Sequence, residues 1–188
     1  MRLRNAILAL PVLLCLGASS CRDRSEGAPV PRRYAYPRVE IPDTATATYR
    51  IGSVEARLSS DARVESNRPE WLTATYASLG ATFYLATAAA PDEGAVAEAL
   101  ANRRRRVSLN LGGAQARTDH FSTPAGFDVE LIVCREAVTT PVQFIATGKG
   151  AVVSGAFVLY GATEPADSLR PIVDILECET FAIARSLR

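Results

Sequence analysis

The sequence is poor in the residues that build metal sites. It contains one histidine and four cysteines in 188 residues, and neither a C-x-x-C nor an H-E-x-x-H pattern occurs. Zinc centres need several thiolate, imidazole or carboxylate ligands at short spacings. The sequence therefore argues against a metalloenzyme, and we expect no metal and no other cofactor.

An excess of charge of one sign is also missing. The 21 Lys and Arg residues and the 20 Asp and Glu residues give a net charge of +1. Proteins that bind nucleic acids through bulk charge carry a strongly basic surface, so a nucleic-acid partner is not expected. The composition, 48% hydrophobic and 22% charged, is typical of a chain with one packed core.

No long hydrophobic run is present either, but a short one stands near the start. Arg2 and Arg4 precede an apolar stretch over 6–16, about half the length that a membrane-spanning helix needs, and small residues then lead to Cys21. This pattern predicts a lipoprotein signal peptide over residues 1–20. The small residues resemble the lipobox of bacterial lipoproteins, in which the cysteine thiol receives a diacylglycerol and the peptide bond before it is cut. Simple secretion with cleavage nearby is the alternative.

We therefore predict that Cys21 is lipidated and that the protein is a membrane-anchored lipoprotein of the cell envelope, facing the periplasm. Acyl chains contribute about 0.8 kcal/mol for each buried CH₂ group, so a multiply acylated N-terminus holds a domain at a membrane almost irreversibly. No later run of the sequence is long and apolar enough to span a bilayer.

Residues 21–44 have the composition of an extended tether. Prolines and arginines are interleaved in this segment, namely Pro29, Pro31, Arg32, Arg33, Pro37, Arg38 and Pro42. Proline fixes φ and has no amide N–H to donate, which excludes it from helix interiors and central strands. Tyr34 and Tyr36 add more apolar surface than a spacer needs, so we expect the second half of the tether to lie along the domain surface or along a partner. Because exposed aromatic and arginine side chains anchor interfaces, the candidate partner-binding residues here are Arg32, Tyr34, Tyr36 and Arg38.

Residues 45–188 are predicted to form a single α+β domain. Strand-like runs bounded by turn residues are expected at 46–58, 71–76, 81–87, 116–122, 127–134, 142–147 and 152–160. The short links between successive runs favour antiparallel pairing. One helix is expected to begin near Asp92 and to end at Gly112, with the arginine run 103–106 in its last turn.

A second helix, beginning at Asp167 or Ser168, is the clearest element. Its apolar residues recur at helical spacing on one face, namely Leu169, Ile172, Val173, Leu176, Ile183 and Leu187. The order of strands, helix, strands and helix predicts an antiparallel sheet of about six or seven strands packed against helices.

Few residues suggest catalysis. His120 is the only imidazole, and its neighbour Asp119 points to the opposite face of a strand, so it cannot readily orient the ring. Ser154 lies inside a strand pattern rather than on the sharp turn of a hydrolase nucleophile. We therefore do not expect an enzyme, and an envelope hydrolase built around His120 is the least favoured hypothesis.

The arginine run and the two later cysteines leave alternatives open. Residues 103–106 form either a solvated helix end or a contact site for anionic headgroups or an acidic partner. Cys134 and Cys178 lie in a predicted strand and a predicted helix, where a disulfide is geometrically feasible outside the cytoplasm. The alternative is that both are small buried hydrophobic residues.

Several segments carry a resemblance to a known family. After the tether from Pro31 to Pro42 they are, in order, Trp71, Phe83-Tyr84-Leu85, Thr140-Pro141-Val142-Gln143-Phe144, Ser154-Gly155-Ala156-Phe157 and Asp167-Ser168-Leu169-Arg170-Pro171-Ile172. With the lipidated start, this order resembles the gliding motility lipoprotein GldD family of Bacteroidetes-type bacteria, over most of residues 21–188. The scarcity of lysine, with Lys149 alone, departs from that family.

The resemblance implies an envelope lipoprotein that supports gliding motility and the associated type IX protein secretion through contacts with other envelope proteins. A fold like that of the PsbP and Mog1 proteins is compatible with the element order by analogy. Further candidate partner-binding residues are Thr140, Pro141, Gln143 and Phe144, on the expectation that they are exposed. The alternative function is a periplasmic small-ligand binding or sensor lipoprotein with a pocket between sheet and helix. The oligomeric state is not specified.

Overall fold

The computed structural model describes residues 46–136, 138–160 and 166–188. The predicted signal peptide and tether lie outside the described residues, and so do Cys21, Arg32, Tyr34, Tyr36 and Arg38. The described residues form one compact unit with its own hydrophobic core, of a size at which single domains fold by themselves. None of the described helices combines the length and the hydropathy needed to cross a membrane.

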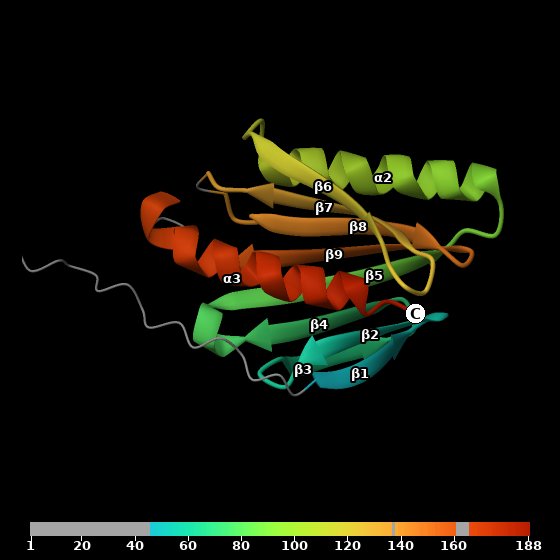
Figure 1. Cartoon of the computed structure of the whole chain (residues 1–188), viewed down its shortest axis with the longest axis horizontal. Coiled ribbons are helices and arrows are strands. Elements are labelled where there is room, and N and C mark those ends of the chain that lie inside the picture. Colours follow the sequence, from blue (N-terminus) through green and yellow to red (C-terminus); the bar gives the residue numbers. More distant parts are fainter. Residues whose placement is uncertain (1–45, 137, 161–165) are drawn as a thin grey trace, which may run out of the picture. The chain divides into compact units, whose positions relative to one another are not determined.

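The described residues contain a two-stranded sheet, a seven-stranded sheet and two α-helices (Figure 1). The small sheet pairs β1 (Thr46–Ile51) with β2 (Val54–Ser59). The strands of the large sheet are β3 (Arg63–Arg68), β4 (Trp71–Tyr76), β5 (Ala81–Ala89), β6 (Ala116–Ser122), β7 (Asp128–Cys134), β8 (Val142–Gly148) and β9 (Ala151–Leu159). The helices are α2 (Glu93–Leu111) and α3 (Ala166–Arg185), and the short 3₁₀ turn η1 (Ala77–Leu79) joins β4 to β5.

The large sheet has the order β3-β4-β5-β9-β8-β7-β6, and each neighbouring pair is antiparallel. The predicted α+β fold with an antiparallel sheet of six or seven strands is therefore confirmed. Hairpins account for most of the pairs, as the short links predict. The exception is β5 with β9, which brings together strands on either side of α2, β6, β7 and β8.

The strand β3 has no counterpart in the predicted elements. Its residues, RVESNR, are polar on both faces, and four of the six are exposed. It is an edge strand that pairs only with β4 in the described sheet. Charged edge strands protect a sheet from pairing with another chain, so the position of β3 explains why hydrophobic alternation is missing.

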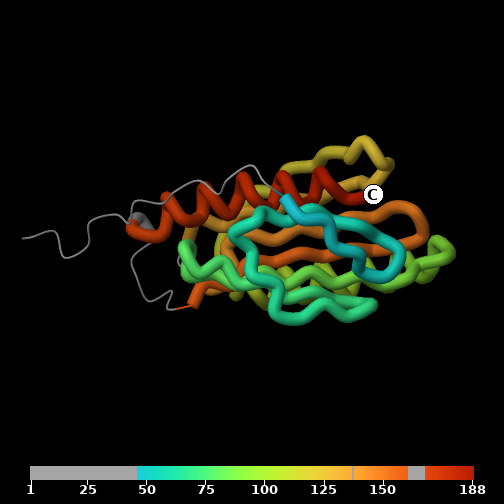
Figure 2. The backbone as a smooth tube through the Cα atoms, turned by 90° about the horizontal axis from the view of Figure 1, so that it is seen from below, coloured from blue at the N-terminus to red at the C-terminus, as the bar shows by residue number. Residues whose placement is uncertain are grey.

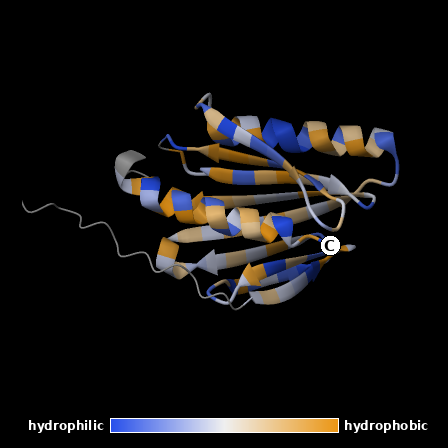
Figure 3. Ribbon diagram, viewed as in Figure 1, coloured by the Kyte–Doolittle hydropathy of each residue, from blue (hydrophilic) through white to orange (hydrophobic). Residues whose placement is uncertain are grey.

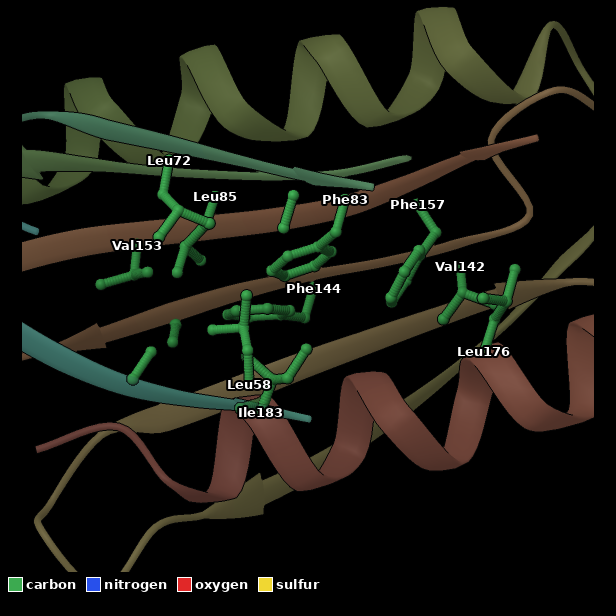
Figure 4. Close-up of a cluster of buried hydrophobic side chains, with 14 of the residues drawn as sticks. Leu58, Leu72, Phe83, Leu85, Val142, Phe144, Val153, Phe157, Leu176 and Ile183 are labelled. Carbon is green, nitrogen blue, oxygen red and sulfur yellow. The ribbon is translucent and has the colours of Figure 1, made fainter. Parts of the chain in front are cut away.

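The main core lies on the face of the large sheet that α3 and the β1–β2 hairpin cover. Figure 2 shows the hairpin beside α3, and the two elements are in contact through β2. Figure 4 shows Phe83, Phe144 and Phe157 of the sheet facing Leu176 and Ile183 of α3. The rings of Phe83 and Phe157 have centroids 4.7 Å apart, a favourable distance for aromatic pairs.

One glycine is required by this packing. A Cβ atom at Gly155 of β9 would lie 2.1 Å from the Cε1 atom of Phe144 and 2.8 Å from the Cζ atom of Phe83. Real Cβ atoms do not approach other heavy atoms so closely. Gly155 therefore makes room for two aromatic rings of the core.

Helix α2 lies on the opposite face of the sheet, over β8 and β9. Its N-cap is Asp92, whose side chain accepts a hydrogen bond from the N–H of Ala95 at 2.8 Å, and Gly112 ends it with a φ of 58°. Val96, Leu100 and Val107 pack partly buried against a small cluster of sheet residues. None of its residues is fully buried, so α2 rests on the sheet more loosely than α3.

The arginine run does not occupy the last turn of α2, and that detail of the prediction is wrong. The helix continues past Arg106 to Leu111, and its last turn contains no basic residue. In Figure 3 the run forms a hydrophilic stretch in the middle of the helix, between more apolar turns. The arginines therefore lie within α2 rather than at its end, with Arg103 partly buried and Arg104, Arg105 and Arg106 exposed.

Candidate functional site

The predicted partner-binding residues at 140–144 are buried. Thr140, Gln143 and Phe144 retain 5%, 3% and 1% of their accessible surface, and Pro141 is buried too. They lead into β8, a central strand whose two faces are covered by α2 and α3. The prediction that they form an exposed contact surface is therefore wrong.

The two cysteines in the described residues are free thiols. Cys134, at the end of β7, is buried, whereas Cys178 on α3 is exposed. The disulfide, one of the two alternatives that the sequence left open, is therefore not formed in this structure. Cys134 fits the alternative of a small buried hydrophobic residue, and Cys178 fits neither prediction.

His120 is exposed on β6, beside a polar groove that also includes Ser122 and Asp128. The Ser122 hydroxyl donates a hydrogen bond to Asp128 at 2.7 Å rather than to the imidazole. The carboxylate of Asp119 accepts a hydrogen bond from Arg117 at 2.9 Å. In the part of the chain that the structure describes, no hydrogen bond joins His120 to a nucleophile or to an orienting acid, and no group of three His, Cys, Asp or Glu residues is arranged to hold a metal.

Large exposed hydrophobic side chains gather on the α2 face of the sheet. Trp71 of β4 is 41% exposed, Tyr84 of β5 is 40% exposed, and Leu109 of α2 and Tyr160 after β9 are more exposed still. The hydroxyls of Tyr84 and Tyr160 lie 3.1 Å apart. We call these four residues the apolar patch. A group of this kind on one face is typical of a binding surface.

A pocket of about 320 Å³ opens between α2 and the sheet, and Tyr84 and Leu109 of the apolar patch line it. Its floor is formed by β5, β8 and β9 and its wall by the second half of α2. The lining residues on the floor are Tyr84, Ala86, Phe144, Ser154, Gly155, Ala156 and Val158, and those on the wall are Arg103, Arg106, Val107, Leu109 and Asn110. Thr140 and Gln143 complete the lining. The small side chains of the floor allow a ligand to approach the sheet closely.

The arginines of the run divide between the two flanks of α2. Arg104 donates to the carboxylate of Glu130 on β7, with one contact at 3.3 Å. Arg103 and Arg106 line the pocket on the other flank, and neither enters an ion pair with a described residue. Burial, together with the charge of Arg106, lowers the pKa of the Arg103 guanidinium from its ordinary value. An arginine remains protonated at neutral pH, so the pocket wall carries two positive charges.

Two amides, the exposed Asn110 and the buried Gln143, connect the wall to the floor. Asn110 Nδ2 donates a hydrogen bond of 2.7 Å to Gln143 Oε1, and Gln143 Nε2 donates to the carbonyl oxygen of Thr140 at 3.4 Å. These bonds let Gln143 remain buried in a central strand, because a buried amide is tolerated when its polar atoms have partners. Thr140, Gln143 and Phe144, predicted as exposed contacts, thus meet as part of the pocket lining.

The proximity of Tyr84, Arg103 and Arg106 was not predicted from the sequence. Arg103, Arg106 and Asn110 recur at spacings of three and four, which places them on one flank of a helix. That spacing was a usable signal. Their position opposite Tyr84 depends on the β5–β9 pairing, for which the sequence contains no local signal.

Comparisons with known proteins give a likeness in structure but none in sequence. No protein-family model matches the chain, and no curated protein matches its sequence. The Ran-binding protein Mog1p of Saccharomyces cerevisiae has a similar structure, with a TM-score of 0.47 and 8% sequence identity, over 77% of this chain and 96% of Mog1p. The likeness concerns the fold alone and says nothing about ligands or partners. The class that the fold defines is thus an α+β domain with one central antiparallel sheet between two helices, and Mog1, the analogy drawn from the sequence, is among the proteins it resembles.

Proposed function

We propose that the chain is a lipid-anchored accessory protein of the cell envelope, which acts through non-covalent contacts and not through catalysis. The apolar patch carries this proposal, because Trp71, Tyr84, Leu109 and Tyr160 offer a partner aromatic and aliphatic surface without unfolding the domain. Aromatic side chains at such patches supply much of the binding free energy of interfaces.

The cellular location and the process in this proposal are inferred from the sequence. The small residues before Cys21 support a lipid anchor, and the resemblance to the GldD family supports a role in gliding motility and the associated type IX secretion. The partners would then be the membrane, through the anchor, and other envelope proteins of that machinery. The tether residues Arg32, Tyr34, Tyr36 and Arg38 remain candidate contacts in this proposal.

A deletion strain complemented with variants tests the proposal. The double substitution Trp71→Ser and Tyr84→Ser should abolish colony spreading and adhesin secretion, as Cys21→Ala should by removing the anchor. The matched control is Phe181→Ser, which removes an aromatic ring of 38% exposure on α3, on the opposite side of the sheet. Normal spreading and secretion in the deletion strain itself would refute the role in motility. Normal behaviour of the double variant would refute the patch as the contact surface.

The pocket favours a second candidate function, that of a periplasmic small-ligand binding or sensor lipoprotein. Its volume of about 320 Å³ lies in the range of small-molecule sites. Such sites combine an apolar lining with a few polar groups that orient the ligand, and here Arg103, Arg106 and Asn110 are the polar groups. Co-purification of a small molecule with the domain, identified by mass spectrometry, would support this candidate, and recovery of an empty domain from native envelopes would count against it.

A further inference from the structure

The pocket carries positive charge that no described carboxylate compensates by an ion pair. Arg103 and Arg106 lie on the same flank of α2, and their positive charges repel each other. The charge of Arg104, the next residue after Arg103, is compensated by an ion pair with Glu130 on the other flank of the helix. No described carboxylate does the same for the two pocket arginines. An anion placed between them would relieve both the repulsion and the cost of burying Arg103.

Most of the other lining side chains are small or apolar, the exceptions being Tyr84, Asn110, Thr140, Gln143 and Ser154. Ala86 of β5 and Ala156 of β9 form a floor of small side chains, with Val107, Leu109 and Val158 along the sides. An alkyl chain laid on this floor would bury apolar surface on both sides, against the sheet and against α2. The floor begins beside the arginines, so an acid group and an alkyl chain of one molecule reach the two parts together.

We propose that this pocket binds a single-chain anionic amphiphile, with its acid group between Arg103 and Arg106 and its alkyl chain across Ala86, Ala156 and Val158. The inference rests on the second candidate function, ligand binding by the envelope domain, and specifies the class of the ligand. A carboxylate fits the planar guanidinium groups by paired hydrogen bonds. The amphiphile is bound as a free molecule rather than as part of a bilayer, because Arg103 is half-buried against the sheet and cannot meet a flat membrane surface directly.

Dodecanoate is the probe for the test, used below its micellar concentration with residues 38–188, the unit that contains the whole described core. Trp71 is the only tryptophan of the sequence and lies opposite Ala86 in the β4–β5 register, so its fluorescence reports on the pocket. We expect saturable binding of dodecanoate and at least tenfold weaker binding of dodecanol, because the alcohol lacks the charge that the arginines hold.

Two kinds of variant localise the binding. Arg103→Gln and Arg106→Gln should each weaken dodecanoate binding about ten- to a hundredfold, the usual loss when a hydrogen bond to a charged group is removed. Arg104→Gln is the matched control, since this arginine belongs to the same run but pairs with Glu130, and its dissociation constant should stay within about twofold of the original. Ala156→Leu fills the floor without changing charge and should abolish binding.

Several results would overturn the inference. One is the absence of saturable binding, and another is an equal affinity for dodecanoate in the original chain and in both arginine variants. An affinity for dodecanol equal to that for dodecanoate would show that the arginines do not bind the acid group. Adsorption to phosphatidylglycerol vesicles without binding of free dodecanoate would identify a membrane-contact surface instead. If dodecanoate does not bind but the deletion strain fails to spread, the ligand class alone is refuted. If dodecanoate binds saturably but the deletion strain spreads normally, the role in motility alone is refuted.

Discussion

Replacing Gly155 by alanine tests how tightly the main core is packed. The new Cβ atom would lie 2.1 Å from Phe144 Cε1 and 2.8 Å from both Phe144 Cδ1 and Phe83 Cζ. Carbon atoms in contact normally stand about 3.5–4 Å apart, so the ring of Phe144 must move by about 1.5 Å or more. Phe144 is held between the sheet and α3, and its displacement strains neighbours on both sides.

The expected cost follows from this overlap. Overpacking a core costs about 1–3 kcal/mol, and the severity of the contact places Gly155→Ala at the upper end. Alanine restricts the unfolded chain and returns about 0.4–1 kcal/mol. The net loss in the free energy of unfolding is therefore about 2 kcal/mol, which lowers the melting temperature by roughly 4–8 °C for a domain of this size.

Urea unfolding followed by Trp71 fluorescence measures the loss. Gly94→Ala is the matched control. Gly94 lies in the first turn of α2, and a Cβ atom added there would have a side-chain oxygen of Asp92 as its nearest neighbour, at 3.2 Å. This substitution should be neutral or stabilise the domain, because glycine is a poor helix residue. Combining Gly155→Ala with Phe144→Leu should recover part of the loss. Ordinary surface substitutions change the free energy of unfolding by about 0.5 kcal/mol or less. A change no larger than that for Gly155→Ala would refute the described packing of Phe144.

Three further predictions concern single groups. Burial raises the pKa of Tyr76 far above its ordinary value of 10.0, and the charge of Glu179 raises it further. The unfolded chain therefore loses this proton first, so the free energy of unfolding falls as the pH rises above about 10. In urea titrations Tyr76→Phe should make that fall less steep, and an unchanged slope would contradict the assignment. The hydroxyl of Thr73 is buried with no hydrogen-bond partner in the described residues, so Thr73→Val should leave stability unchanged or raise it by up to about 1 kcal/mol, whereas a marked loss would reveal a missing partner. In residues 38–188, a thiol reagent should modify Cys178 rapidly and Cys134 only on unfolding, and equal rates for both would contradict the burial of Cys134.

Local patterns predicted most of the strands. The ranges expected for β4 and β6 match the observed strands, because turn residues bound both on either side. The polar strand β3 had no such pattern, since an edge strand needs no buried face. The end of α2 at Gly112 was predicted correctly, but the arginine run was placed in the last turn although five helical residues, 107–111, lie between it and Gly112.

The candidate site was harder to predict because its parts come from distant segments. Tyr84 and Ala156 meet only through the β5–β9 pairing, and Arg103 joins them from α2. Gln143 was predicted as exposed together with its neighbours at 140–144, as part of a candidate contact segment. Its amide is instead satisfied inside the protein by Asn110 and by the Thr140 carbonyl, two partners that no local pattern indicates.

The closure of the main core by β2 and α3 has a consequence for when the chain can fold. Leu58 of the first hairpin and Ile183 of the last helix belong to the same cluster, and the backbone of Glu55 exchanges hydrogen bonds of 2.9 and 3.1 Å with Arg188. During synthesis, the hairpin emerges from the ribosome long before the helix that covers it. The domain cannot complete its interior until nearly all of these residues have been made, and a chain passed to an export channel during translation would still be unfolded there.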